Sequence, residues 1–396
     1  MPIRKLPSFA GIDNAREDEA LERGGDSPSL HVREALNIDI SETGRASLRA
    51  GVAQQTQLPF KWLWQSSLHG DCFASLHGDW VKVNPEDWSY EVLYAGAAAG
   101  RTKHIILNSR VLMCSDAGLF VYDGANALKF TLDTPAAPYV TQDGDGSLHE
   151  GQYNFAVSWL RNGVESGLSE ISNLQCAGQN SAQVAFPLCT DPSVTHIRLY
   201  MTEAGGSVLY QVEDYPIAAA QAHIALLPAL GAAAVSQYID PMPAGKYLNL
   251  WRGRIITVRA NVIYFSQAMA FHLCDMRYSF IQMPQRITFL EPVDGGIWVG
   301  QTDHVVFLRG ADLQQMTVEP KASARPIPDS SFLADSALLA QLNTSSSAAV
   351  WLSEKGFTAG TADGQLVELQ KTVMKNISGI SASAVGLDGR VTAVVN

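Results

Sequence analysis

Two short segments of the chain carry histidine and aspartate residues that could bind a metal ion. The pentapeptide Ser-Leu-His-Gly-Asp occurs twice, eight residues apart, and supplies His69, Asp71, His77 and Asp79. Imidazole nitrogens and carboxylate oxygens are both ligands for zinc. The same residue types are common in tight turns, because Gly and Asp adopt the backbone angles that turns require. Two turns in a meander of short strands are the favoured interpretation, and a metal cluster is the alternative.

A second acidic segment resembles the start of a calcium loop. Residues 143–147 read Asp-Gly-Asp-Gly-Ser, which places side-chain oxygens at alternate positions. A calcium loop also needs a glycine and a distal bidentate glutamate. Leu148 and Asn154 stand at those two positions, so a linker turn is the favoured interpretation.

Glycoside hydrolysis is the catalytic chemistry that the carboxylates could support. It needs two carboxyl groups a few ångströms apart, a separation that sequence cannot measure. Glu291, Asp294, Asp303 and Glu354 are candidates. All four lie in or beside expected turns, where acidic residues are ordinary, and this favours a structural role.

The tryptophans fall into two groups. Trp298 and Trp351 occupy equivalent central-strand positions in two repeats, which predicts that both are packed in a core. The other group lies close together near the N-terminus and is a candidate aromatic surface for a ligand such as a sugar. Its members are Trp62, Trp64, Trp80 and Trp88.

Composition excludes several functional classes. The 396 residues include 39 acidic and 28 basic ones, for a net charge of −11. No basic stripe of the kind that binds nucleic acid non-specifically is apparent, and the acidity argues against docking on an anionic membrane. The five cysteines are scattered without C-x-x-C spacing, so neither a zinc site nor a disulfide framework is implied. No phosphate-binding, dinucleotide or H-E-x-x-H motif occurs, and no cofactor is expected.

A pattern of two apolar strands joined by a short polar turn occurs four times. One such pair cannot bury both of its faces, and recurrence at about 40 to 50 residues is typical of a β-propeller. We therefore predict an all-β protein with a propeller of about five to six blades. The four hairpins span 111–121, 255–265, 297–308 and 350–359.

The spacing of the hairpins predicts the domain organisation. The first two begin about 145 residues apart, which indicates an insertion of about 100 residues. Short strands and Gly-rich turns within it predict an immunoglobulin-like or fibronectin-like sandwich. The predicted parts are an N-terminal arm at 1–30, a first propeller part at 31–135, the inserted sandwich at 136–242 and a second propeller part at 243–396.

Two local features complete the predicted fold. Strand 36–40 or 46–50 is expected to pair with 391–395, which would close the propeller with N- and C-terminal strands and remove exposed edges. Residues 330–342 are the best helix candidate, with an apolar face and a serine or aspartate cap.

An ordered series of motifs resembles a family of tail proteins encoded by tailed bacteriophages. The series opens with Phe-Ala-Gly-Ile-Asp-Asn at 9–14 and Arg-Glu-Ala-Leu-Asn-Ile-Asp at 33–39. Later matches cover nearly the whole chain in order, at 165–167, 198–200, 251–254, 263–266, 294–300, 350–356 and 363–365.

The resemblance implies a structural virion protein similar to tail nozzle or tail-tip components, with no catalytic residues. Its expected partners are other tail proteins, further copies arranged around the tail axis, and a host receptor or polysaccharide. DNA would pass through the channel without specific binding. The protein would be assembled in the host bacterial cytoplasm and reside in the virion tail. A carbohydrate-binding adhesin and a propeller glycosidase are the alternatives.

The N-terminal arm is richer in acidic residues than the family pattern, and its candidate assembly residues are Glu17, Asp18, Glu19 and Asp26.

Overall fold

The computed structural model describes residues 8–23, 29–41, 43–49, 51, 53–68, 70–335, 347–387 and 390–396. Over these residues the regular structure is all β, apart from two short 3-10 helices, η1 (Asp18–Ala20) and η2 (Leu313–Gln315). No helix in the described ranges has the length and apolar character needed to span a membrane. The chain forms two compact units. One contains 1–58, 260–262 and 282–396, and the other contains 59–259 and 263–281.

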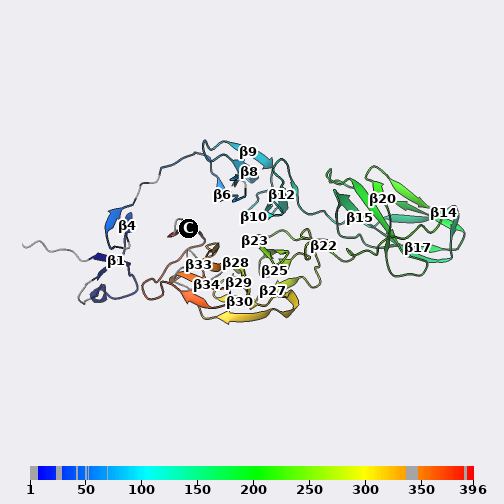
Figure 1. Cartoon of the computed structure of the whole chain (residues 1–396). Coiled ribbons are helices and arrows are strands. Elements are labelled where there is room, and N and C mark those ends of the chain that lie inside the picture. The colour runs from blue at the N-terminus through cyan, green and yellow to red at the C-terminus, as the bar shows by residue number, and fades with distance from the viewer. Residues whose placement is uncertain are drawn as a thin grey trace, which may run out of the picture. The chain divides into compact units, whose positions relative to one another are not determined.

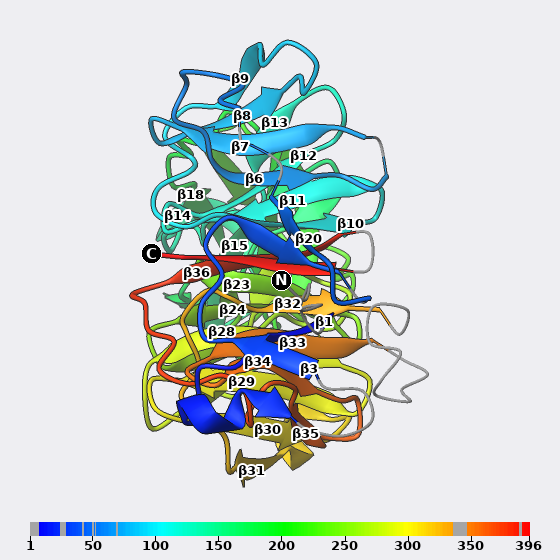
Figure 2. The same ribbon diagram turned by 90° about the vertical axis from the view of Figure 1, so that its left-hand side faces the viewer.

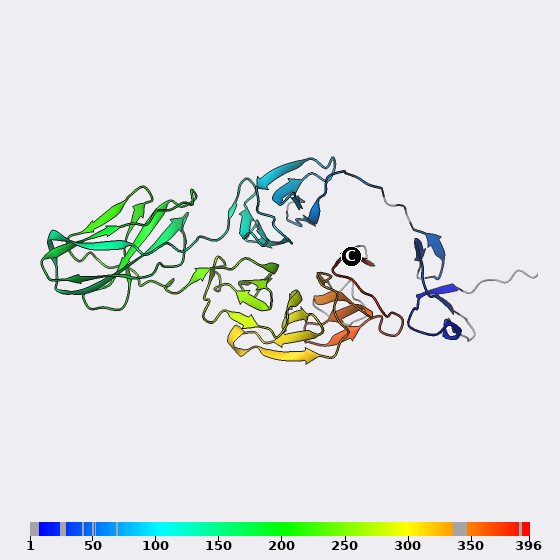
Figure 3. The same cartoon turned by 180° about the vertical axis from the view of Figure 1, so that it is seen from behind.

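The unit built around 59–259 contains three four-stranded sheets in which neighbouring strands follow chain order. Figure 1 labels several of their strands, and Figure 3 shows the same ribbon from behind. The first sheet comprises β6 (Lys61–Gln65), β7 (Cys72–Leu76), β8 (Asp79–Val83) and β9 (Tyr90–Tyr94). The second comprises β10 (Lys103–Leu107), β11 (Arg110–Cys114), β12 (Leu119–Tyr122) and β13 (Ala127–Lys129). The third comprises β23 (Lys246–Trp251), β24 (Arg254–Arg259), β25 (Val262–Phe265) and β27 (Phe280–Gln282). Most neighbouring strands of these sheets are joined by short turns, whereas a longer connection that contains β26 (Leu273–Cys274) joins β25 to β27.

The second sheet is buried on both faces. Val111 and Met113 of β11 pack with the first sheet, whereas Leu112 and Cys114, the alternate residues, pack with the third. Side chains of a strand point alternately to opposite faces, so an uninterrupted apolar run supplies both cores. The continuous apolar sequence of β11 is therefore explained by two partners, one on each side.

The other unit contains two further four-stranded meanders. One comprises β28 (Ile287–Val293), β29 (Gly296–Gln301), β30 (Val305–Arg309) and β31 (Thr317–Lys321). The other comprises β32 (Phe332–Ala334), β33 (Ala348–Ser353), β34 (Gly356–Gly360) and β35 (Leu366–Glu368). These two sheets lie next to each other in Figures 1 and 2 and share one core.

The predicted burial of Trp298 and Trp351 is confirmed. Both are fully buried, and their ring centroids lie 5.6 Å apart across the two sheets. Phe289 stacks on Trp351 at 4.9 Å, and the indole of Trp298 donates a hydrogen bond of 2.9 Å to the carbonyl of Thr361. Aromatic pairs at these distances stabilise a core beyond the area that they bury.

The four hairpins predicted from sequence are confirmed as β11–β12, β24–β25, β29–β30 and β33–β34. The helix predicted over 330–342 is wrong at its start, where Phe332–Ala334 forms β32 and pairs with β33. Pairing satisfies an otherwise open edge of β33, and this outweighs the local helical pattern. Residues 336–342 lie outside the described part of the chain.

The predicted pairing between the ends of the chain is also wrong. In the structure β4 (Ile38–Ile40) pairs with β5 (Ala46–Leu48), and β36 (Ala382–Leu387) pairs with β37 (Arg390–Val395). Each hairpin is a separate two-stranded sheet, because a local turn brings neighbouring strands together at little entropic cost. The C-terminal hairpin packs through Ala382 against Ile327 and Leu352.

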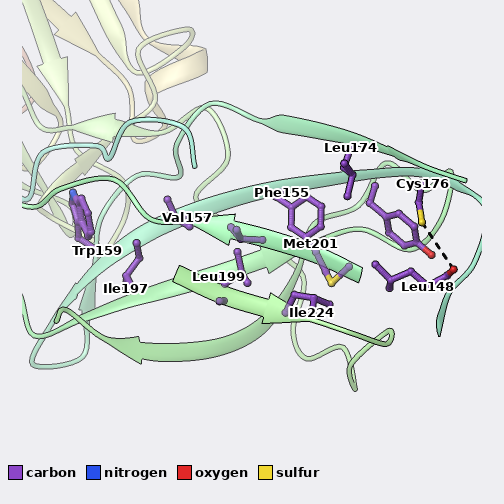
Figure 4. Close-up of a cluster of buried hydrophobic side chains, with 14 of the residues drawn as sticks. Leu148, Phe155, Val157, Trp159, Leu174, Cys176, Ile197, Leu199, Met201 and Ile224 are labelled. Atoms are coloured by element: carbon purple, nitrogen blue, oxygen red, sulfur yellow. Dashed lines mark hydrogen bonds between the residues drawn. The ribbon is translucent and has the colours of Figure 1, made fainter. Parts of the chain in front are cut away.

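Eight strands between the second and third meanders form two sheets around a common core. One sheet has the order β14 (Tyr139–Leu148), β18 (Asn180–Ala185) and β21 (Gln221–Ile224). The other contains β15 (Gly151–Arg161), β16 (Val164–Glu165), β17 (Ser172–Cys176), β19 (His196–Met201) and β20 (Tyr210–Pro216). Alternate residues of β15, including Phe155, Val157 and Trp159, point into this core, which Figure 4 shows. We call this part the inserted sandwich.

Three smaller pairings complete the described structure. β1 (Ser8–Ile12) runs parallel to β3 (Ser29–Val32), and β2 (Glu22–Arg23) pairs with the other edge of β3. β22 (Asp240–Pro241) pairs with β26 (Leu273–Cys274) where the chain leaves the inserted sandwich.

Replacement of Trp351 by alanine tests the core between the two meanders. We expect a loss of about 3 to 5 kcal/mol in the free energy of unfolding, because the change leaves a large cavity. Ile380→Ala is the control, since this side chain is 89% exposed, and it should change stability by less than about 0.5 kcal/mol. Chemical denaturation followed by tryptophan fluorescence measures both. Equal stabilities of the two variants would contradict the packing described.

The pH dependence of stability tests the core between the first two sheets. His104 is buried between Trp64, Phe73 and Trp80, and burial lowers its pKa to about 3. The unfolded chain binds a proton near pH 6.5 and the folded chain does not, so stability is lost as the pH falls below 6.5. This histidine should cost about 2 kcal/mol at pH 5 relative to pH 8. Denaturation midpoints measured across that range should depend less on pH in His104→Leu, and a control His149→Leu should retain the wild-type dependence.

Candidate functional site

The four clustered tryptophans lie on the first meander but do not share one exposed surface. Trp80 is fully buried between the first and second sheets, so its prediction as a surface residue is wrong. It lies on β8 at a position whose side chain points to the neighbouring sheet. Trp64 is half-buried and stacks on His104, with ring centroids 5.3 Å apart and 12° between the planes.

Trp62 and Trp88 are each half-buried in different surroundings. Trp88 packs against Phe60, with a centroid separation of 6.2 Å. Trp62 lies at an irregularity in the pairing of β6 with β7, and its φ of +54° is uncommon for a bulky residue. The guanidinium of Arg101 lies 5.0 Å from the centre of the Trp62 ring and 5.5 Å from that of Tyr247. The arrangement is a cation–π contact, which holds the ring in place.

The repeated His-Gly-Asp segments form a hairpin turn and an ion pair. His77 and Gly78 both have positive φ and connect β7 to β8, which confirms the turn interpretation there. Asp71 pairs with Lys82 at 3.0 Å, and Asp79 accepts a hydrogen bond from the amide of Gly96. His69 lies outside the described residues. Within the described ranges no group of three or more His, Cys, Asp or Glu residues is placed to hold a metal.

The segment at 143–147 belongs to strand β14, so the predicted linker turn is wrong. Asp143 pairs in register with Ser181 of β18, and two irregularities in the register follow it. The segment therefore satisfies backbone groups within the sheet, while the Asp143 and Asp145 side chains are exposed.

The candidate glycosidase carboxylates are divided between strand ends. Asp294 precedes β29 and Asp303 follows it, which separates them by on the order of 20 Å along the strand. Asp303 contacts His304 and accepts a hydrogen bond of 2.8 Å from Gln285. Glu291 is buried in β28, where it accepts a hydrogen bond from Ser331, and Glu354 lies in the turn after β33.

The N-terminal arm is anchored on its own chain. The side chain of Asn14 accepts a hydrogen bond from the amide of Lys375 (2.8 Å) and donates one to its carbonyl (3.1 Å). The backbone amide of Asn14 also donates to the carbonyl of Val373. Of the predicted assembly residues, Asp18 pairs with Arg33, while Glu17 and Glu19 are exposed. Asp26 lies outside the described residues.

Two motif segments 33 residues apart meet on one sheet of the inserted sandwich. Glu165 belongs to β16, whereas Arg198 and Tyr200 belong to β19, and β15 lies between these strands. Glu165 Oε1 accepts hydrogen bonds of 2.6 Å from the hydroxyls of Tyr200 and Ser158, and its Oε2 lies 3.0 Å from Nη1 of Arg198. We call these residues, together with Asp214, the Glu165 network.

Asp214 completes the network from β20. It binds Arg198 through two parallel hydrogen bonds of 2.6 and 2.8 Å, the bidentate geometry that guanidinium and carboxylate favour. The pair lowers the pKa of Asp214 and raises that of Arg198. Burial and the hydrogen bond to Glu165 raise the pKa of Tyr200, so its hydroxyl stays protonated and donates.

The sequence motifs included three members of the Glu165 network but missed Ser158 and Asp214. Ser158 is fully buried on β15, and Asp214 pairs in register with Arg198 across β19 and β20. The signal that could have found Asp214 is an opposite charge at the facing position of the expected next strand. The hydrogen bonds of the network join side chains of four strands, and they therefore help to fix the register of these strands.

Comparison with known proteins gives no family. No protein-family model and no curated protein sequence matches the chain.

Similar solved structures include the computationally designed Ika8 protein, at 10% identity over 86% of this chain and 97% of that one, with a TM-score of 0.24. The extracellular domain of a protein described as a hybrid two-component system from B. thetaiotaomicron is 9% identical over 87% of this chain, with a TM-score of 0.25. This chain spans 58% of that domain. The tricorn protease is 11% identical over 82% of this chain and 36% of its own, with a TM-score of 0.20. Likenesses this weak support no statement about function.

Substitution of Glu165 tests the Glu165 network. Glu165→Gln removes the charge next to Arg198 and disturbs the bonds from Tyr200 and Ser158, and we expect a loss of about 1 to 3 kcal/mol of stability. Glu170→Gln changes an exposed carboxylate of the same part of the chain and should cost less than about 0.5 kcal/mol. Thermal denaturation measures both. A Glu165→Gln variant as stable as Glu170→Gln would show that the network contributes nothing.

Proposed function

We propose that this chain is a non-enzymatic structural component of a bacteriophage tail, of the nozzle or tail-tip type. In this proposal the five four-stranded meanders are blades of a propeller, and the inserted sandwich is a fibronectin-like domain that contacts neighbours or the host. The observation that carries it is the repetition of one meander in chain order, five times, interrupted once by a two-sheet insertion. Four-stranded blades in sequence are the building plan of propellers.

The motif series supports the same proposal. Its segments at 165–167 and 198–200 lie far apart in sequence and contribute to one network in the inserted sandwich. Its segments at 294–300 and 350–356 cover the central strands of two meanders that share a core. Segments that resemble one family and also cooperate physically are better evidence than isolated matches.

The described surfaces supply means of assembly. Each terminal hairpin has only two strands, and isolated two-stranded sheets are marginal in water. Val385 and Val394 of the C-terminal hairpin are 56% and 61% exposed. Open edges and exposed apolar residues favour contact with other chains, and axial symmetry favours several copies in a ring. The exposed acids Glu17 and Glu19 would meet a basic neighbour or face the DNA passage.

A carbohydrate-binding adhesin is the second candidate, and the half-buried Trp62 is the observation that favours it. Its ring is held by Arg101 and is partly accessible, as a sugar platform requires. A propeller glycosidase would need a carboxylate pair, and Asp294 and Asp303 lie at opposite ends of one strand.

Electron microscopy of the purified full chain tests the structural proposal. We expect ring-shaped oligomers with an axial opening, and gold-labelled antibodies against the chain should bind the tails of phage particles that contain it. The double variant Glu17→Lys, Glu19→Lys should shift the oligomer towards monomer in light scattering, because it reverses charge at the arm. Glu86→Lys, Glu91→Lys is the matched control, because it reverses two exposed charges of the first meander to which the proposal assigns no contact, and it should leave the oligomer unchanged.

Three results would contradict the proposal. They are a chain that stays monomeric at all concentrations, unlabelled tails, and glycan binding that is abolished by Trp62→Ala while no oligomer forms. The last result would favour the adhesin.

A further inference from the structure

A cavity of about 390 Å³ lies where the inserted sandwich meets the second meander. Its wall includes Leu128 and Phe130 from the end of the meander, Arg161 and Ser193 from the inserted sandwich, and Arg110 from the start of β11. The volume is within the range of small-ligand sites, which combine an apolar lining with a few polar groups.

Arg161 is the unusual residue of this wall. Its side chain is buried, with only 6% of the residue exposed. Its guanidinium donates to the carbonyls of Lys129 and Phe130, at 2.8 Å each, and to the hydroxyl of Ser193 at 3.2 Å. Among the described contacts, none of these bonds goes to a carboxylate and Nε makes none at all.

The buried charge of Arg161 is only indirectly compensated. Asp191 acts on it through space, and this carboxylate is engaged by the amide and hydroxyl of Ser193. Carbonyl oxygens supply partial charge but no full counter-ion, and burial lowers the pKa of Arg161. A buried cation without a paired anion is costly, so an anion that enters the cavity would be stabilised there.

The remaining charges of the cavity favour an anion as well. Arg110 adds a second guanidinium, and Asp123 is the one carboxylate among the described lining residues. His272 donates from Nε2 to the carbonyl of Glu165, and burial lowers its pKa, so it is neutral. The lining therefore carries two positive charges and one negative charge. Asn126 and Thr195 add uncharged groups that can bond to hydroxyls.

We propose that this junction cavity binds a small organic anion of about monosaccharide size, whose carboxylate or phosphate pairs with Arg161 and Arg110. Guanidinium groups bind both anions through paired hydrogen bonds. The inference does not depend on the function proposed above, because it rests on the charge and burial of residues within one unit. Since the ligand would contact both the meander and the inserted sandwich, its binding would stabilise their junction.

Calorimetric titration of the full chain tests the proposal with three probes that are built on the same glucose ring. Glucuronate carries a carboxylate, glucose 6-phosphate carries a phosphate, and glucose is the neutral control. We expect one site per chain for at least one of the charged probes, with glucose bound at least about tenfold more weakly. Affinity should fall as salt is raised.

Variants assign the binding to this cavity. Arg110→Gln removes an exposed charge of the wall and should weaken binding about tenfold or more, with an unchanged melting temperature in the absence of ligand. Lys61→Gln removes an exposed charge from β6, outside the cavity, and should bind as wild type does. Arg161 is unsuitable as the first variant, because its bonds to the carbonyls of Lys129 and Phe130 also fix the backbone at the end of β13.

Each outcome is decisive. Binding of only one charged probe, lost in Arg110→Gln, supports the proposal and identifies the anion. Equal binding of glucose would overturn the role of charge. Unchanged affinity in Arg110→Gln would overturn the site, and a folded chain that binds neither anion at 10 mM (roughly 3 kcal/mol of affinity) would overturn the proposal.

Discussion

Burial on both faces is the constraint on which the rest of this structure depends. The second meander divides the alternate residues of β11 and β12 between two cores, one shared with the first sheet and one with the third. A four-stranded sheet with two apolar faces cannot remain alone in water, so the second meander needs a neighbour on either side. The low charged fraction of 17% and the full burial of Trp80, Trp298 and Trp351 follow from the same requirement.

The inserted sandwich buries its apolar residues in a core of its own and not against the meanders. Its eight strands enclose a core of their own, so the chain can leave the second meander and return for the third without exposing either. The two connections are fixed by polar contacts. Arg161 donates hydrogen bonds to the carbonyls of Lys129 and Phe130, where the chain leaves the second meander. His272, which follows the return to the third meander, donates one to the carbonyl of Glu165. Gly167 allows the backbone at Ile239 to approach more closely than any side chain would permit. The cavity proposed to bind an anion is a consequence of this junction.

Sequence reasoning succeeded where local pattern and burial agree. The four apolar hairpins and the burial of Trp298 and Trp351 could be predicted, because two short strands around a turn carry their own signal. Prediction failed where the structure of a segment depends on residues far away in the sequence. Residues 332–334 form a strand because they pair with β33, and Trp80 is a core residue because a second sheet covers it. The surroundings of Arg161 come from positions 129, 130 and 193, and no spacing in the sequence relates those positions.

The motifs that prompted the resemblance have mechanical roles in this structure. Within the segment at 294–300, Gly295 lies against the backbone of Ala362, Gly296 against that of Leu308, and Gly300 against the ring of Phe289. A side chain at any of these positions would collide with a neighbouring segment, while Trp298 fills the core between two sheets. Asn14 likewise bonds to the backbone of Lys375, and Glu165 joins strands of one sheet. These motifs allow backbone segments to lie close together, fix the register of strands and anchor the N-terminal arm, and all of these are roles in maintaining the fold. They constrain how strands meet and leave the chemistry of the surface unspecified, so a ligand site such as the junction cavity has to be sought outside the motifs.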